Sequence, residues 1–180
     1  LGPTLFLRCV SLTAAFEGHS YTLAAGNWDA AGVTWGLIGF QIRSGSLGHV
    51  LRRIPRPDLD AALSPAGASE ILAACALTDP AARVAWGASI SDADPRRVVP
   101  LWRSRFANLG QTPSAQAAQL SVAREEYWDP ARRWCLANDL VSERSHALLL
   151  DILVQQGDRR LRLAGQLAVR DALGVGRPEE

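Results

Sequence analysis

Two carboxylates stand on either side of a turn-rich stretch near the start of the chain. Glu17 follows Phe16 at the end of an apolar segment, and Asp29 comes twelve residues later, beside Asn27 and Gly32. Cleaving a glycosidic bond requires one protonated carboxyl group to assist the leaving oxygen and one ionised carboxylate to act on water or on the sugar. An apolar environment raises the pKa of a carboxyl group. We therefore expect Glu17 to be the acid and Asp29, in its polar turn, to stay ionised.

The same two residues also fit a purely structural interpretation. Glu17 would then be an exposed carboxylate at a helix end, and Asp29 an ordinary turn residue. Residue types alone leave both interpretations open.

Other side chains near Asp29 suit sugar binding. Trp28 and Trp35 place aromatic surface beside it, on which a sugar face can stack, although one of the two equally fits a core position. Asn27 and His19 are polar candidates for the same cleft, and His19 also fits an ordinary surface histidine.

The elements expected around these residues are mainly helical. Apolar residues recur at helical spacing over 5–16, and this helix is expected to end near Gly18. The period is lost over 21–32. Residues 33–40 favour one short strand, in which Gly36 and Gly39 indicate the close approach of another backbone or of a ligand.

Four later helix starts are indicated by a repeated device, an N-cap side chain followed by proline. The pairs are Ser64-Pro65, Asp79-Pro80, Asp94-Pro95 and Asp129-Pro130. The helices expected after residue 40 are 46–54, 65–77, 80–86, 95–109, 114–128, 130–138, 142–156 and 159–173. The segment 142–156 is apolar nearly all round and is expected to be a buried central helix. The sequence thus predicts a mainly α (α+β) fold with a small β element between its first two helices.

Composition limits the class of protein. Hydrophobic residues make up 48% and charged residues 21% of 180, as in a folded domain with one core. A net charge of +1 without a basic stripe argues against a nucleic-acid partner. No stretch has the roughly 18 apolar residues of a membrane span, and no signal-peptide pattern opens the chain. We expect a single domain over 1–180 that, lacking an initial Met, is excised from a longer protein.

The three cysteines, Cys9, Cys75 and Cys135, are odd in number, far apart and set among apolar neighbours. This pattern favours buried free thiols over a disulfide framework. No histidine or acidic residue has metal-ligand spacing, so we expect neither a metal nor a cofactor.

Two segments carry motifs that can be compared with a known family. The chain has Phe16-Glu17, then Asp29-Ala30-Ala31-Gly32-Val33-Thr34-Trp35-Gly36-Leu37-Ile38-Gly39-Phe40. This resembles glycoside hydrolase family 46, the chitosanases of the lysozyme superfamily, with Phe-Glu-Asn and then Asp-Gly-Arg-Gly-aromatic-Thr-x-Gly-Ile-Ile-Gly-Phe. Tyr127-Trp128-Asp129-Pro130-Ala131 is similar to the family's Tyr-Phe-x-Pro-Ala, and Gln155-Gln156-Gly157 to its Gln-His-Gly. The similarity covers most of the chain in order, but it is sharp only over 16–40 and 127–157.

The resemblance implies a lysozyme-like domain of two lobes with a catalytic cleft between them. It implies that Glu17 is the general acid, that Asp29 is the general base, and that both face this cleft. Thr34, five residues after Asp29 as in the family, would help to hold the attacking water, although a β-branched residue also suits a strand. The mechanism would be inverting, with the carboxyl groups roughly 6.5–9.5 Å or more apart.

Two departures from the family bear on the substrate. The Arg of the family's Asp-Gly-Arg-Gly is absent here. After Gly39-Phe40 the chitosanases carry Gly-Thr-Gly-Asp, whose acid faces a cationic glucosamine, whereas this chain has Arg43 and then Ser46 in place of the acid. Binding an amine calls for an opposing carboxylate. Arg43 and Ser46 therefore suit a neutral or anionic glycan, and peptidoglycan, with its acidic stem peptides, fits best.

We therefore expect a hydrolase of the peptidoglycan glycan strand, either a bacterial or phage lytic enzyme or an antibacterial toxin domain. It would act in the periplasm or the extracellular cell wall, and an immunity or inhibitor protein is a conceivable partner. One alternative is a chitosanase-like hydrolase of variant specificity. Another is a catalytically inactive glycan-binding module, since the family's Arg is missing. The arginines near Trp102, Trp128 and Trp134 form solvated helix faces or include one that attracts stem-peptide carboxylates.

Overall fold

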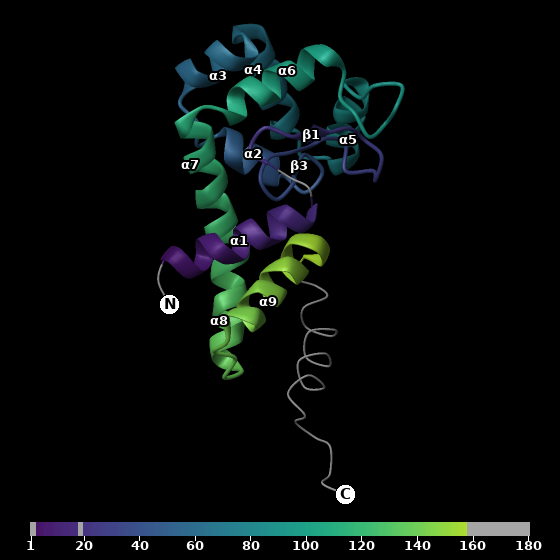
Figure 1. Ribbon diagram of the computed structural model, residues 1–180. Helices are drawn as coiled ribbons and strands as arrows, with labels where there is room; N and C mark the ends of the chain where they lie inside the picture. The colour runs from purple at the N-terminus through teal and green to yellow at the C-terminus, as the bar shows by residue number, and fades with distance from the viewer. Residues whose placement is uncertain (1–2, 18–19, 158–180) are drawn as a thin grey trace, which may run out of the picture. The chain divides into compact units, whose positions relative to one another are not determined.

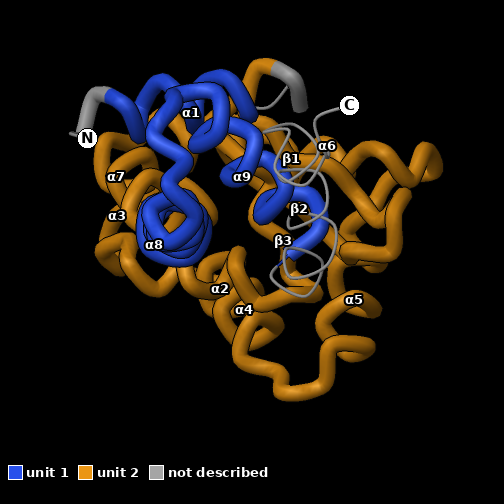
Figure 2. The backbone as a smooth tube through the Cα atoms, turned by 90° about the horizontal axis from the view of Figure 1, so that it is seen from below, with its two compact units in different colours: residues 1–13, 124–180 blue, residues 14–123 orange. Residues whose placement is uncertain are grey.

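The computed structural model describes residues 3–17 and 20–157, and only the backbone of residues 3, 4, 16 and 17. It is mainly helical, with a small three-stranded antiparallel sheet between the first two helices, as predicted (Figure 1). The chain forms two compact units. Unit 1 contains residues 1–13 and 124–180, and unit 2 contains residues 14–123 (Figure 2). No helix of the described ranges is long and apolar enough to cross a bilayer.

The sheet of unit 2 consists of β1 (Ala24–Ala25), β2 (Thr34–Trp35) and β3 (Phe40–Gln41), in that order. The prediction of one strand over 33–40 was wrong, because residues 36–39 form the turn that joins β2 to β3. Gly36 and Gly39 have φ values of 91° and 68°, a conformation that glycine adopts without steric cost.

The helices of unit 2 pack around this sheet. They are α2 (Ser46–Leu51), α3 (Arg56–Leu63), α4 (Pro65–Ala76), α5 (Pro80–Ser89), α6 (Pro100–Gly110) and α7 (Pro113–Val122). Helix α3 packs against α4 and α6, and α2 packs against α7 and α4. The largest fully buried side chains of this core are Trp35, Phe40, Ile42, Leu47, Leu51, Leu63, Ile71, Phe106 and Leu109.

Two of the four proline-marked helix starts are confirmed. The Ser64 hydroxyl accepts the Gly67 amide at 3.3 Å, and the Asp79 carboxylate accepts the amides of residues 81 and 82 at 2.9 and 3.2 Å. The helix start predicted at Asp94-Pro95 was wrong. Asp94 Oδ1 accepts the Arg96 amide at 3.1 Å and closes a turn, and the next helix, α6, begins only at Pro100.

Helix α3 was not among the predicted helices, and prolines at positions 55 and 57 flank its first residue. Pro57 lies in the first turn of α3. There its missing N–H has no helical partner to lose.

Unit 1 combines the start of α1 (Pro3–Glu17) with η1 (Ala123–Trp128), α8 (Asp129–Ala137) and α9 (Glu143–Gln156). Trp128 is central to its core, with ring centroids 5.7 Å from Phe6 and 5.6 Å from His146. The guanidinium of Arg8 bonds both carboxylate oxygens of Glu143, at 2.8 and 2.9 Å. Because both side chains are exposed, this ion pair contributes little to stability.

Asp129-Pro130 does not start a separate helix. Helix α7, the π-helical η1 and α8 follow one another without interruption over 113–137. Pro130 offers no N–H to the carbonyl of Glu126, and its ring clashes with that carbonyl in a regular α-helix. The wider π turn just before Pro130 relieves this clash. The predicted helices 114–128 and 130–138 are therefore one helix with a π segment.

Helix α9 buries one face only, which contains His146, Leu149, Leu150 and Leu153. Leu148 is 46% exposed, so the prediction of a helix buried nearly all round was wrong. The predicted helix 159–173 lies outside the described residues. The three cysteines are buried free thiols, as predicted.

Candidate active site

The turn at residues 26–32 holds Asp29 by hydrogen bonds within the turn itself. Asp29 Oδ1 accepts the Ala31 amide at 3.0 Å, and Asn27 Oδ1 accepts the Gly32 amide at 2.9 Å. Ala30 and Gly32 have φ values of 62° and 81°. Short polar side chains that bond their own backbone are the usual way to stabilise such a turn. Asn27 thus positions the turn, and the exposed Asp29 carboxylate is fixed in direction.

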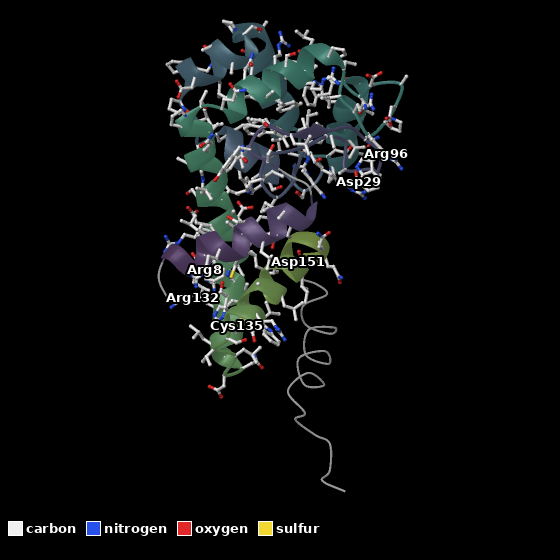
Figure 3. The ribbon with its side chains drawn as sticks, in the orientation of Figure 1. Arg8, Asp29, Arg96, Arg132, Cys135 and Asp151 are labelled. Carbon is white, nitrogen blue, oxygen red and sulfur yellow. The ribbon has the colours of Figure 1, made fainter. Side chains whose placement is uncertain are left out.

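A second loop, residues 91–98, holds the outer side of this turn. The Gly26 amide donates to the Arg96 carbonyl at 3.3 Å, and the Asn27 amide donates to Ser91 Oγ at 2.9 Å. Arg96 and Asp29 lie at the same edge of unit 2 (Figure 3). Ser91 is a positioning residue that sequence analysis missed, since a lone serine 64 positions away carries no signal.

Helix α5 supports the inner side of the turn through glycine contacts. A Cβ on Gly87 would lie 2.5 Å from the carbonyl carbon and 2.7 Å from the Cα of Gly32. Helix and turn therefore meet backbone to backbone, and the Asp29 turn rests on a rigid surface.

Thr34 lies in β2, 7% exposed, and pairs with Ala25 on one side and Gln41 on the other. It is thus held on the strand that follows the Asp29 turn. Its role toward a water molecule stays a prediction.

Only one of the two predicted aromatic platforms has an exposed ring. Trp28 is 58% exposed. Trp35 is fully buried, and its indole N–H donates to the Phe106 carbonyl at 3.1 Å. We therefore withdraw Trp35 as a sugar platform, because its neighbours in the core cover the ring.

Arg43 and Ser46, two predicted substrate contacts that follow β3, lie in different environments. Arg43 is exposed, and its Nη1 donates to the Ala30 carbonyl at 3.3 Å, so its cation stands next to the Asp29 turn. Ser46 is 4% exposed, and its Oγ accepts the Gln41 amide at 2.9 Å. Ser46 positions the backbone after β3. Because Ser46 is buried, a substrate cannot reach it, and the structure contradicts its predicted role as a substrate contact.

Gln119 of α7 is a second residue that sequence analysis missed. Its Oε1 accepts the Leu37 amide at 2.8 Å and its Nε2 donates to the Tyr21 carbonyl at 3.0 Å. A Cβ on Gly36 would collide with Gln119 Oε1. The close approach predicted from the glycines is therefore made by a buried side chain, not by a ligand.

Glu17 is the last residue of α1, and its side chain lies outside the described residues, as does His19. The separation between the carboxyl groups of Glu17 and Asp29 therefore remains a prediction. In the part of the chain that the structure describes, no group of three or more His, Cys, Asp and Glu is placed to hold a metal ion.

Fold and site together define a mainly α protein with a small antiparallel sheet, in which a rigid turn presents an exposed carboxylate. No protein-family model, curated protein or solved structure matches this chain.

Proposed function

We propose that this protein is a lysozyme-type glycoside hydrolase that cleaves the glycan strand of peptidoglycan with inversion. The observation that supports this most is the turn at 26–32, which presents the Asp29 carboxylate from a backbone anchored by Asn27, Ser91 and α5. Groups held in place before substrate arrives lower the barrier, because their ordering needs no binding energy.

In the proposed mechanism, Glu17 protonates the leaving glycosidic oxygen and Asp29 removes a proton from the attacking water. Thr34 helps to hold that water. This requires a lysozyme-like arrangement in which both carboxyl groups face one cleft between two lobes, roughly 6.5–9.5 Å or more apart. The exposed ring of Trp28 offers a stacking surface for a sugar, and Arg43 offers a cation for an anionic stem peptide.

The first test is digestion of purified sacculi, with new reducing ends as the measurement. We expect activity in the parent chain and a loss of about 100- to 10,000-fold in Glu17→Gln and in Asp29→Asn. Asn keeps an Oδ1 acceptor for the Ala31 amide, so Asp29→Asn removes the base and preserves the turn. Asp139→Asn is the matched control, since Asp139 is exposed and has a φ of 57° that Asn tolerates.

Three results would contradict the proposal. If the parent chain releases no reducing ends, and if it binds sacculi with the same affinity as the Asp29→Asn variant does, the protein is an inactive glycan-binding module. Faster turnover of soluble chitosan than of sacculi identifies a chitosanase-like enzyme. Full activity of the Asp29→Asn variant would show that Asp29 is not the general base. Mass spectrometry of the released fragments identifies the reducing-end sugar and hence the bond that is cut.

A further inference from the structure

Two arginine side chains of unit 2 come together beside α2. Arg52 directly follows α2, and Arg83 lies in α5. Helix α4 packs against both α2 and α5, so the three helices adjoin. We propose that Arg52 and Arg83 form a binding site for a doubly charged oxyanion, a phosphate group. The site goes beyond the proposed function, in which neither arginine has a role.

Two glycines let the guanidinium groups approach the backbone at the start of α2. A Cβ on Gly45 would lie 3.3 Å from Nη1 of Arg83, and a Cβ on Gly48 would lie 3.0 Å from Nη1 of Arg52. Three residues correspond to about 4.5 Å along a helix axis. Because neither glycine has a side chain, both cations border the same short stretch of backbone, residues 45–48.

The Cys75 thiol of α4 indicates that both charges act on one place. A Cβ on Gly48 would lie 3.1 Å from the Cβ of Cys75. Burial raises the pKa of Cys75 to about 11, and the positive charges of Arg52 and Arg83 oppose this increase. Electrostatic interactions weaken with distance, so both guanidinium groups lie near this sulfur.

Neither charge is neutralised by the protein. Among the described side chains, no carboxylate is within ion-pair distance of Arg52 or Arg83, and neither arginine donates a side-chain hydrogen bond. Helices α2 and α5 contain no acidic residue. The Asp79 carboxylate caps α5, and Glu70 of α4 accepts the Trp86 indole N–H at 3.1 Å. An anion from outside the protein would therefore offset two unpaired cations.

The number of charges and oxygens favours a phosphate over a carboxylate. A guanidinium presents a planar fork of donors that matches two oxygens of either group. A carboxylate has two oxygens and one charge, so it would pair with one arginine and leave the other without a counter-ion. A phosphate monoester has three terminal oxygens and nearly two charges at neutral pH. It can therefore bond both arginines. Arg83 is partly buried, and salt screens such a pair less than an exposed one.

The test uses the ¹⁵N-labelled full chain and the backbone amide signals of Gly45 and Gly48. The probes are inorganic phosphate, glucose 6-phosphate and acetate, at about pH 8 and at an ionic strength held constant with sodium chloride. We expect both signals to shift saturably with the two phosphates. Tighter binding of the sugar phosphate would identify a phosphorylated glycan as the natural source, and equal binding would identify free phosphate.

Variants report on each arginine. We expect Arg52→Gln and Arg83→Gln each to raise the Kd for phosphate about tenfold, because each removes a charge-assisted hydrogen bond. Arg52 is exposed, so Arg52→Gln tests the site even if Arg83→Gln does not fold. Arg144→Gln is the matched control, since Arg144 is an exposed arginine of α9 in unit 1 and its loss changes the net charge equally.

Three results would overturn the proposal. The first is that phosphate leaves the Gly45 and Gly48 signals unchanged, and the second is that acetate binds as tightly as phosphate. The third is that Arg144→Gln weakens phosphate binding as much as Arg52→Gln does, which would show that phosphate responds to net charge alone.

Discussion

At the scale of single residues, Gln119 connects three segments of unit 2. It is fully buried, and its amide joins α7 to the Leu37 amide of the hairpin and to the Tyr21 carbonyl. A buried polar side chain with both ends paired specifies one arrangement of the loops around it, because any shift leaves a donor or an acceptor unpaired.

Gln119→Leu is therefore expected to destabilise the protein by roughly 2–4 kcal/mol, since it leaves the Leu37 N–H and the Tyr21 carbonyl without their partner. Urea unfolding measures this loss. Gln111→Leu is the control, an exposed glutamine next to the same helices, with an expected change within about 0.5 kcal/mol. Equal losses in the two variants would show that the Gln119 bonds do not hold the hairpin.

The Cys75 thiol makes stability depend on pH in alkaline solution. Burial raises the pKa of Cys75 from 9.0 to about 11. Between these two values the unfolded chain loses the thiol proton and the folded chain keeps it, so the free energy of unfolding falls as pH rises. Below pH 9 this contribution is fully present.

We expect the parent chain to lose stability relative to Cys75→Ala by on the order of 1–3 kcal/mol between pH 9 and pH 11. Urea midpoints across this range measure the difference. Other raised groups, such as Tyr21, are common to both chains and cancel. Parallel curves for the two proteins would show that Cys75 does not ionise differently on unfolding.

At the scale of elements, the Asp29 turn depends on how closely α5 approaches it. Gly87 is buried in the last turn of α5, two residues before the helix ends at Ser89, and glycine lowers the stability of a helix relative to alanine. Here its missing side chain lets the helix backbone lie against that of Gly32.

Gly87→Ala is expected to cost roughly 1–3 kcal/mol, because overpacking exceeds the gain of about 1 kcal/mol in helix propensity. It should also displace the Asp29 turn and reduce sacculus hydrolysis. Ala88→Gly is the control in the same helix at an exposed position, with an expected loss of about 1 kcal/mol and unchanged activity. A Gly87→Ala protein as stable as the parent would contradict this packing.

At the scale of the whole molecule, each of the two units has its own core. In unit 1, Phe6 from α1 packs on Trp128, which packs on His146 of α9. Residues far apart in the chain are thus joined by a few aromatic contacts, while unit 2 is built around its sheet and α2 to α7.

Phe6→Ala is expected to cost roughly 3–5 kcal/mol in unit 1, through lost burial and the cavity that it leaves. Hydrogen exchange should rise in α8 and α9 and stay unchanged in α3 and α6, because units with separate cores open separately. Leu7→Ala is the control, since Leu7 is 44% exposed. Equal increases in both units would show that the molecule unfolds as one cooperative core.

Features that depend on a few neighbouring residues were predictable from the sequence. The caps at Ser64 and Asp79, the polar turn around Asn27 and Asp29, and the mainly helical class all follow from local side-chain chemistry. The catalytic roles of Glu17 and Asp29 were predicted in the same way and stay predictions. Whether Glu17 faces Asp29 stays a prediction, because the Glu17 side chain lies outside the described residues.

Features that depend on distant partners were settled by long-range packing. Asp94-Pro95 and Asp129-Pro130 have the same local signal as Asp79-Pro80, yet one closes a turn against Gly26 and the other lies within a continuous helix. Trp35 belongs to the core because Phe106 stands against it. A dipeptide determines which hydrogen bonds its side chain can make. Which of these bonds forms depends on burial and on partners that only the folded chain brings near.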